Sequence, residues 1–286
     1  MVRRLTPEQR LRKIQRDGVA SSELPMFHDG PVAHTHSKCG KCLAMRRSHQ
    51  FKLLRCAGCN FATYCSKECQ KSDWPTHKTL CKRLKQEREE ISTRSGIPNA
   101  LEDLWAWVDF YDAPLKNCAI ASCFLKENPH EEQRTTLFII LRHHGQSDLP
   151  VQHKFHVDSI CRFPFNQLPP GHIISAQARD TAERMGRVEL GKSFYGIQTF
   201  VVAAHFKGEK YFWPKSFAID KETARANVLQ RDWEDLFCDY VEGGVKVKFC
   251  CGKLGGSSSD ACCCGGWTHD KNKLKAFVEA RDLMNQ

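Results

Sequence analysis

The stretch CSKECQKSDWPTHKTLC, residues 65–81, contains three cysteines and one histidine within seventeen residues. Side chains four positions apart lie on the same face of a helix, so a helical segment would present these four potential metal ligands as two separate pairs. The residues between the pairs are mostly polar, and Trp74 is the single large apolar side chain there. We therefore expect two metal ions, rather than one, to organise this stretch. The four ligands are Cys65, Cys69, His77 and Cys81.

Two further pairs of cysteines lie upstream, in the turns CGKC (Cys39 and Cys42) and CAGC (Cys56 and Cys59). Each CxxC turn contains a glycine, which tolerates the backbone angles that let two thiolates converge on one ion. Together with the first stretch, these turns supply eight ligands. Eight ligands are enough for two tetrahedral Zn²⁺ sites per chain.

The complete spacing resembles the MYND zinc finger over about residues 39–81. The resemblance includes Tyr64 directly before the fifth ligand, and the segment CQKSDWPTHKTLC with Gln70, Asp73, Trp74 and Lys78. RING and PHD fingers place histidine near the middle and end in CxxC, and the HIT-type finger usually has a shorter gap before its histidine, so these classes fit less well. The resemblance implies interleaved sites, with Cys39, Cys42, Cys65 and Cys69 on one zinc and Cys56, Cys59, His77 and Cys81 on the other.

Four protein ligands leave no open position for water on either zinc, so we expect structural rather than catalytic metal sites. The resemblance implies that the finger instead recognises short, extended, proline-containing peptides of a protein partner. By position, Gln70 would bond the peptide backbone and Trp74 would offer an aromatic face to a proline ring. The alternative for Trp74 is a purely structural one, in which the indole fills the small core of the finger.

Composition and charge predict the cellular location of the protein and the class of its partners. Residues 1–100 contain 20 Lys/Arg against 9 Asp/Glu, whereas residues 101–286 contain 23 against 24. The sequence has 16 cysteines but neither a secretory signal nor a run of about 20 apolar residues, so we expect an intracellular protein, in the nucleus or cytoplasm, that does not enter a membrane. The excess of positive charge favours acidic partners, but MYND fingers present no recognition helix of the usual kind. Nucleic acid is therefore not expected to be the specific ligand.

The remaining chain is expected to form an α+β domain. We divide the sequence into a basic N-terminal arm (1–35), the finger with a charged, solvated helical extension (36–91), a linker (92–98) and the α+β domain (99–286). Asn99 and Glu102 suggest a capped helix start. Strands are predicted at 135–144 and 151–163 and as a hairpin at 196–206 and 211–219 that turns at 207–209. Helices are predicted at 172–186, at 222–241 and near 274–278.

Histidines and cysteines of this domain are the candidate metal ligands or acid/base groups. His143, His144, His153 and His156 are expected to be ordinary surface residues beside strand ends, and Cys118, Cys123, Cys161 and Cys238 to be thiols of the core. A Gly/Ser/Cys-rich loop near 250–266, followed by His269, is predicted not to bind a third metal, because adjacent cysteines direct their sulfurs apart. No GxSxG, HExxH, GxxxxGK[ST] or GxGxxG motif is present, nor the motif residues of a SET methyltransferase.

Two functions remain open from the sequence. The first is a non-enzymatic adaptor in which the finger binds a proline-containing peptide, with a role in transcriptional regulation. The second is an enzyme whose catalytic domain, residues 99–286, is brought to its substrate by the finger. The missing motifs favour the adaptor. The sequence leaves the oligomeric state undetermined.

Overall fold

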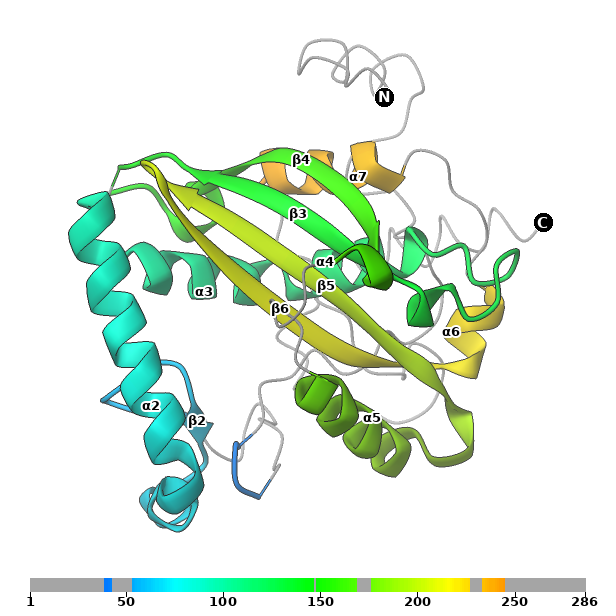
Figure 1. The fold of residues 1–286 in the computed structure, drawn as a ribbon, viewed down its shortest axis with the longest axis horizontal. Coiled ribbons are helices and arrows are strands. Elements are labelled where there is room, and N and C mark those ends of the chain that lie inside the picture. The colour runs from blue at the N-terminus through cyan, green and yellow to red at the C-terminus, as the bar shows by residue number, and fades with distance from the viewer. Residues whose placement is uncertain (1–38, 43–52, 147, 169–175, 227–232, 245–286) are drawn as a thin grey trace, which may run out of the picture.

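A computed structural model describes residues 39–42, 53–146, 148–168, 176–226 and 233–244. Its centre is a four-stranded sheet, drawn in green and yellow in Figure 1, with the strand order β4-β3-β5-β6. The central strands β3 and β5 are parallel, and each outer strand is antiparallel to its neighbour. This mixed sheet with its helices confirms the predicted α+β architecture. The strands are β3 (Thr135–His143), β4 (Phe155–Pro164), β5 (Phe194–Phe206) and β6 (Glu209–Asp220).

The hairpin formed by β5 and β6 agrees with the prediction, except that its loop is one residue shorter. Lys207 and Gly208 connect the strands, and Glu209 already belongs to β6. Both loop residues have positive φ angles, 46° for Lys207 and 102° for Gly208. A two-residue loop of this kind twists in the same sense as the strands it joins, and glycine adopts such angles without strain.

Alternating side chains of β5 face two different helices. Gln198 donates from Nε2 to the carbonyl oxygen of Ala119 in α4 (Asp112–Ala121), at 3.3 Å. The next residue, Thr199, accepts from Arg179 of α5 (Ala176–Leu190) at 3.0 Å on the opposite face. Both faces of β5 are therefore covered, which is why this strand is an almost continuous apolar run.

Helix α3 (Ala100–Phe110) lies on the same side of the sheet as α4 (Figure 1). Its predicted apolar positions Leu101, Leu104, Trp105 and Val108 are all buried, as their helical spacing indicated. The predicted cap was wrong in its detail. Asn99 occupies the N-cap position but makes no side-chain capping hydrogen bond, and Glu102 instead pairs with Arg88 at 3.1 Å.

The long helix α2 (Lys67–Ser95) connects the finger to the sheet along the left side of Figure 1. It continues across the first residues of the predicted linker and ends at Gly96, which has a left-handed conformation. The expectation of a fully solvated extension was wrong, because Leu84 and Ile91 are buried in one core together with α3 and the sheet. Whether the finger and the sheet are separate domains stays a prediction.

The shorter elements complete the described fold. The finger contributes β1 (Leu54–Arg55) and β2 (Thr63–Tyr64), which pair antiparallel. Val151–His153, predicted as the start of a strand, form a 3-10 turn before β4. The predicted helix at 222–241 is represented by α6 (Lys221–Ala226) and α7 (Trp233–Glu242), with residues 227–232 outside the described part. Further 3-10 turns are Glu131–Gln133, Phe165–Gln167 and Gly191–Ser193.

Some predictions concern residues that the structure does not describe. The basic arm, the 250–266 loop with its cysteines, and the helix near 274–278 all lie outside the described ranges. Within those ranges, no helix combines the length and the hydropathy needed to cross a membrane. Of the predicted core thiols, Cys118, Cys123 and Cys238 are buried, whereas Cys161 is half-buried.

Candidate metal centres

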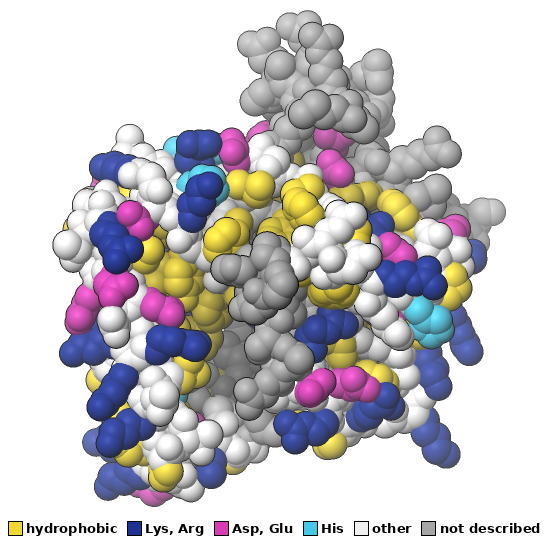
Figure 2. All heavy atoms as spheres, viewed as in Figure 1, with side chains coloured by type: hydrophobic (Ala, Val, Ile, Leu, Met, Phe, Trp, Pro, Cys, Tyr) yellow, Lys and Arg dark blue, Asp and Glu magenta, His cyan; other side chains and the backbone are white. Residues whose placement is uncertain are grey.

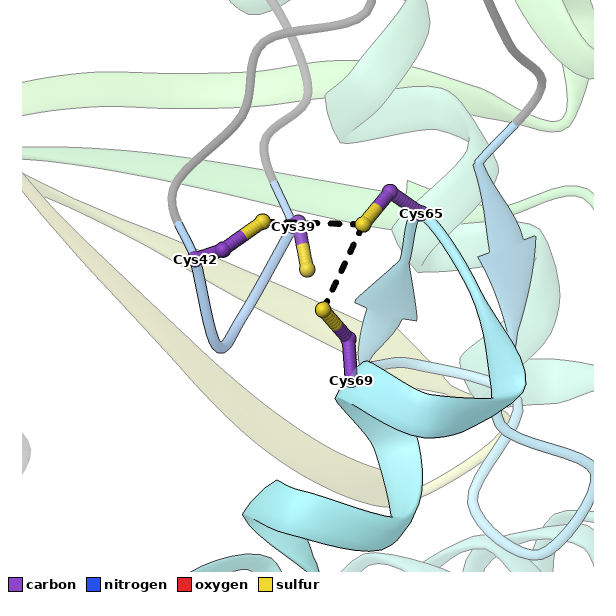
Figure 3. Close-up of side chains that lie close together, drawn as sticks. All are labelled: Cys39, Cys42, Cys65 and Cys69. Atoms are coloured by element: carbon purple, nitrogen blue, oxygen red, sulfur yellow. Dashed lines mark hydrogen bonds between the residues drawn. The ribbon is translucent and has the colours of Figure 1, made fainter.

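The first cluster of ligands, here called site 1, contains Cys39, Cys42, Cys65 and Cys69. Figure 3 shows the four thiols converging from the CGKC turn on one side and from the start of α2 on the other. The Cys65 sulfur lies 3.5 Å from that of Cys42 and 3.4 Å from that of Cys69. Cys39 is buried, Cys42 is exposed and the other two are intermediate. Site 1 is therefore open to solvent on one side.

The second cluster, site 2, contains Cys56, Cys59, His77 and Cys81. The sulfurs of Cys56 and Cys81 are 3.8 Å apart, and the Cys59 sulfur lies 3.6 Å from Nε2 of His77. All four ligands are buried. The two ligand pairs of α2 thus meet different turns, so the structure brings the eight predicted ligands together in the interleaved arrangement that the resemblance implied.

The donor sets fit zinc. In each cluster the ligand atoms lie within 4.8 Å of one another, as the ligands of a single ion must. Thiolate and imidazole are the ligands of structural Zn²⁺, and four of them complete a tetrahedron. When bound, each zinc would cross-link a turn to α2. Neither ion would retain an open coordination position for a substrate.

Close packing explains why glycine occupies the second CxxC turn. A Cβ atom at Gly58 would lie 2.9 Å from the Cys81 sulfur, so any larger residue would push this ligand away. In the first turn, the backbone N–H of Gly40 donates to the carbonyl oxygen of Thr63 in β2 at 2.8 Å. The second turn is thus packed against α2, and the first turn is hydrogen-bonded to the small hairpin of β1 and β2.

The start of α2 corrects one detail of the sequence interpretation. Cys65 and Cys69 were expected to share a helical face, but the helix begins only at Lys67. Ser66 is the N-cap, and its side chain accepts from the backbone N–H of Cys69 at 3.2 Å. Cys65 therefore lies before the helix and reaches site 1 from the bend that connects β2 to α2. His77 and Cys81 do form a pair of ligands separated by one helical turn, as predicted.

Local hydrogen bonds prepare some thiols for metal binding. Burial by itself would raise the pKa of Cys39 and Cys56, but backbone N–H groups of their CxxC turns lower these pKa values to about 6 and about 7. Neighbouring thiols, Cys69 first, raise the pKa of Cys65 to about 12, and burial and then Cys56 do the same for Cys81. A metal ion must therefore displace the thiol protons of Cys65 and Cys81 when it binds.

Tyr64 packs against a ligand of site 2 and is held in place by Asp73. Its hydroxyl donates to the Asp73 carboxylate at 2.8 Å, and its ring meets the edge of the His77 ring with centroids 5.9 Å apart. Burial, followed by the hydrogen bond to Asp73, raises the pKa of Tyr64 well above its ordinary value. The tyrosine and aspartate of the sequence motif thus orient a metal ligand.

A family comparison agrees with this geometry, because the model of the MYND finger matches residues 37–81. Residues 37–81 are a MYND finger. Its two clusters are cross-braced, and each supplies the ligands for one zinc ion, which gives two per chain.

Similar proteins share mainly this part of the chain. Histone-lysine N-methyltransferase SMYD3 of Homo sapiens is 42% identical over 103 residues, covering 29% of this chain and 23% of that protein. SET domain and MYND-type zinc finger protein 6 of Schizosaccharomyces pombe is 35% identical over 98 residues, or 28% and 19% of the two chains. Dauer abnormal formation protein 25 of Caenorhabditis elegans is 46% identical over 54 residues, or 19% and 13%.

The similarity leaves most of both chains unmatched. This chain spans less than a quarter of the length of these curated relatives. No solved structure matches it. The finger is therefore assigned by comparison, whereas the sheet is known here from its own structure.

The two residues predicted to bind a peptide lie in the first turns of α2. Trp74 is 42% exposed, and the edge of its ring meets the His77 ring with centroids 6.1 Å apart. Gln70 is half-buried. The alternative role for Trp74, filling the finger core, does not fit its exposure. Its role in peptide binding, like that of Gln70, stays a prediction.

An aromatic contact between the finger and the sheet was not found from the sequence. Phe61, between the second CxxC turn and β2, lies 5.4 Å from Trp105 of α3 and 4.8 Å from Trp213 of β6, measured between ring centroids. Arg55 adds an exposed ion pair with Asp109 of α3 at 3.2 Å. These residues are far apart in the sequence, and no local pattern indicates that they meet. The contact joins site 2 to the α+β region.

One of the histidines considered for chemistry is not a surface residue. His143 is buried, its Nδ1 accepts from the backbone N–H of Gly145 at 2.8 Å, and its Nε2 lies 3.2 Å from Asp103. Because Nδ1 accepts, the ring proton is on Nε2 and is donated to Asp103. Lys154 contacts the same carboxylate oxygen at 3.2 Å. Both ring nitrogens of His143 are thus engaged within the fold, Nδ1 with the turn that follows β3 and Nε2 with Asp103 of α3.

Proposed function

We propose that this protein is a non-enzymatic adaptor whose MYND finger binds a proline-containing peptide of a protein partner and that it acts in transcriptional regulation. A role of the finger in protein interaction follows from the family of residues 37–81. The preference for proline rests on one observation, the position of Trp74. Its exposed indole is held beside a buried metal ligand, so it presents a rigid apolar face to solvent.

The rigidity of Trp74 supports this function in energetic terms. An aromatic side chain that is fixed before binding loses little conformational entropy when a peptide docks on it. Proline-containing segments are also already extended, so both partners lose little freedom. The zinc ions would contribute by holding α2 and its tryptophan in place rather than by reacting.

The enzyme alternative draws on the names of the relatives, two of which are described as histone-lysine N-methyltransferases. Those matches cover at most 29% of this chain. In the described part of residues 99–286, His143, a buried histidine with a carboxylate partner, uses both ring nitrogens within the fold. We therefore favour the adaptor and assign it to the nucleus or cytoplasm.

The test is a peptide array probed with the zinc-loaded full chain, followed by fluorescence anisotropy on the best peptides. We expect proline-containing peptides to bind, and Trp74→Ala to weaken them by at least about tenfold, since stacking on an aromatic ring contributes on the order of 1 kcal/mol or more. Phe212→Ala is a matched control, because Phe212 is 41% exposed but lies in β6. No preference for proline in the wild type, or an equal loss with both variants, would refute the proposal.

A further inference from the structure

The two halves of α2 differ in whether their lysines and arginines are paired with carboxylates. In the second half, taken here as residues 83–95, every lysine and arginine has a carboxylate within 4.0 Å, and residues 67–82 are taken as the first half. In the first half, the four lysines are exposed, and none has a carboxylate within that distance among the described residues. The pairs of the second half are Arg83–Glu87, Lys85–Glu89, Arg88–Glu102 and Arg94–Glu90. The lysines of the first half are Lys67, Lys71, Lys78 and Lys82.

The two acidic residues of the first half offset only part of this charge. Asp73 accepts the hydrogen bond of the Tyr64 hydroxyl. Glu68, in the first turn, interacts first with its own backbone N–H and with Ser66, and more weakly with the charges of Lys71 and Lys67. Figure 2 agrees with this division, since dark blue predominates at the lower left, over the first half of α2, and magenta is mixed in higher along the helix.

Helical geometry places the four lysines around Trp74. Successive residues turn by about 100°, so Lys71 and Lys78, three positions before and four after Trp74, lie on its face of the helix. Lys67 and Lys82 extend the same stripe by about one turn at each end. With a rise of about 1.5 Å per residue, the stripe is about 22 Å long. An exposed indole thus lies in the middle of a line of positive charges.

The like charges of this stripe destabilise the first half of α2 when no ligand is bound. Lys67 and Lys71 are four positions apart, as are Lys78 and Lys82, and like charges at this spacing repel each other. The same spacing carries opposite charges in the second half of α2, where Arg83 and Lys85 pair with Glu87 and Glu89. An extended chain with negative charges on both sides of Trp74 would relieve this repulsion.

We propose that the peptide received by Trp74 is acidic on both sides of its proline-containing centre and that Lys67, Lys71, Lys78 and Lys82 select it. This inference rests on the proposed function, because it assumes that Trp74 contacts the peptide. It adds the charge of the partner. The lysines would act as a group at distances of several ångströms, so the selection depends on ionic strength.

The experiment compares three synthetic peptides that share a Pro-Pro centre and carry Asp/Glu, Gln/Asn or Lys flanks. Their affinities for the zinc-loaded full chain are measured by anisotropy at two salt concentrations. At ~0.1 M salt, where the Debye length is ~10 Å, we expect the acidic peptide to bind about tenfold more tightly than the neutral one. At ~1 M salt, where that length is ~3 Å, the ratio should fall below about twofold.

Two double variants identify the charges responsible. Lys71→Gln/Lys78→Gln should remove most of the preference for acidic flanks and leave the neutral peptide unaffected. Arg83→Gln/Lys85→Gln removes the same charge from the paired half of the helix and should change the preference by less than about twofold. Zinc content is measured for both variants, because lysines that merely balance the thiolate charge would give a different result, a lower zinc content without a change in peptide selection.

The outcomes separate the two proposals. Binding of proline-containing peptides that depends on Trp74 but ignores the flanks would overturn this inference and leave the proposed function standing. Absence of any peptide binding would overturn both. A lysine-dependent preference for single-stranded RNA over all three peptides would overturn the inference in favour of nucleic acid.

Discussion

Site 2 has four buried ligands, whereas site 1 has one buried cysteine, Cys39, and three that solvent can reach. Both sites belong to the same finger and take one pair of ligands each from the region of α2. The difference lies in what packs outside the metal. Site 2 is next to Phe61, which contacts α3 and β6 through two tryptophans, while Cys42 of site 1 lies in an exposed turn.

The comparison indicates that the two metal sites of a cross-braced finger can stabilise different parts of the protein. The core cluster that continues into α3 and the central strands contains Cys56, Cys59 and Cys81 of site 2, whereas site 1 contributes Cys39, with Cys65 and Cys69 only partly buried against the cluster. Site 2 therefore helps to hold the finger against the sheet as well as to fold the finger. Site 1 fixes the first CxxC turn against the start of α2, which carries the exposed Trp74 and its lysines.

The largest expected difference concerns the removal of one ligand from each site. His77→Ala should lower the free energy of unfolding by at least ~5 kcal/mol, because structural zinc contributes an apparent ~10–16 kcal/mol per site in finger peptides. This loss should also reduce the melting temperature of the sheet. Cys42→Ala, at the exposed edge, should unfold site 1 but leave the melting of the sheet nearly unchanged.

Circular dichroism and native mass spectrometry under reducing conditions measure both effects. The wild type should carry two zinc ions per chain, and each variant one. A melting temperature of the sheet that falls equally in both variants would contradict the division of tasks described above.

A smaller effect is expected when the contact between finger and sheet is broken without touching a ligand. Phe61→Ala should cost about 3 kcal/mol, near the lower end for truncating a core phenylalanine, because the ring is half-buried. Both zinc ions should remain bound. Phe163→Ala, which removes a more exposed ring in β4, should cost less than about 1 kcal/mol. Denaturant unfolding gives these values, and equal losses would show that Phe61 does not join the two regions.

The smallest expected effect is the order in which the thiols become accessible. During slow chelation of zinc, Cys42 and Cys65 should be alkylated about tenfold faster than Cys56 and Cys81, which corresponds to a difference of ~1.4 kcal/mol in local opening. Peptide mapping of the alkylated chain at successive times gives the rates. Simultaneous alkylation of both groups would mean that the two sites open as one unit.

Much of the fold was predicted because its determinants are local. Strands β3 and β5 are apolar runs, and the loop at Lys207 and Gly208 that leads into β6 is marked by its glycine. The side chains of His143 and Glu102 were misjudged because their partners come from other elements. A histidine beside a strand end is buried or exposed according to what packs over it, and here Asp103 of α3 does so.

The sequence alone determined the eight zinc ligands, because CxxC turns and a helical pair of ligands fix which donor atoms can reach one ion over short stretches of chain. Tertiary structure decided that site 2 is buried and site 1 is not. That difference depends on Phe61, Trp105 and Trp213, which lie 44 and 108 residues apart in the chain and meet only when α3 and β6 fold together. Burial is a property of the surroundings, and no spacing of ligands specifies it.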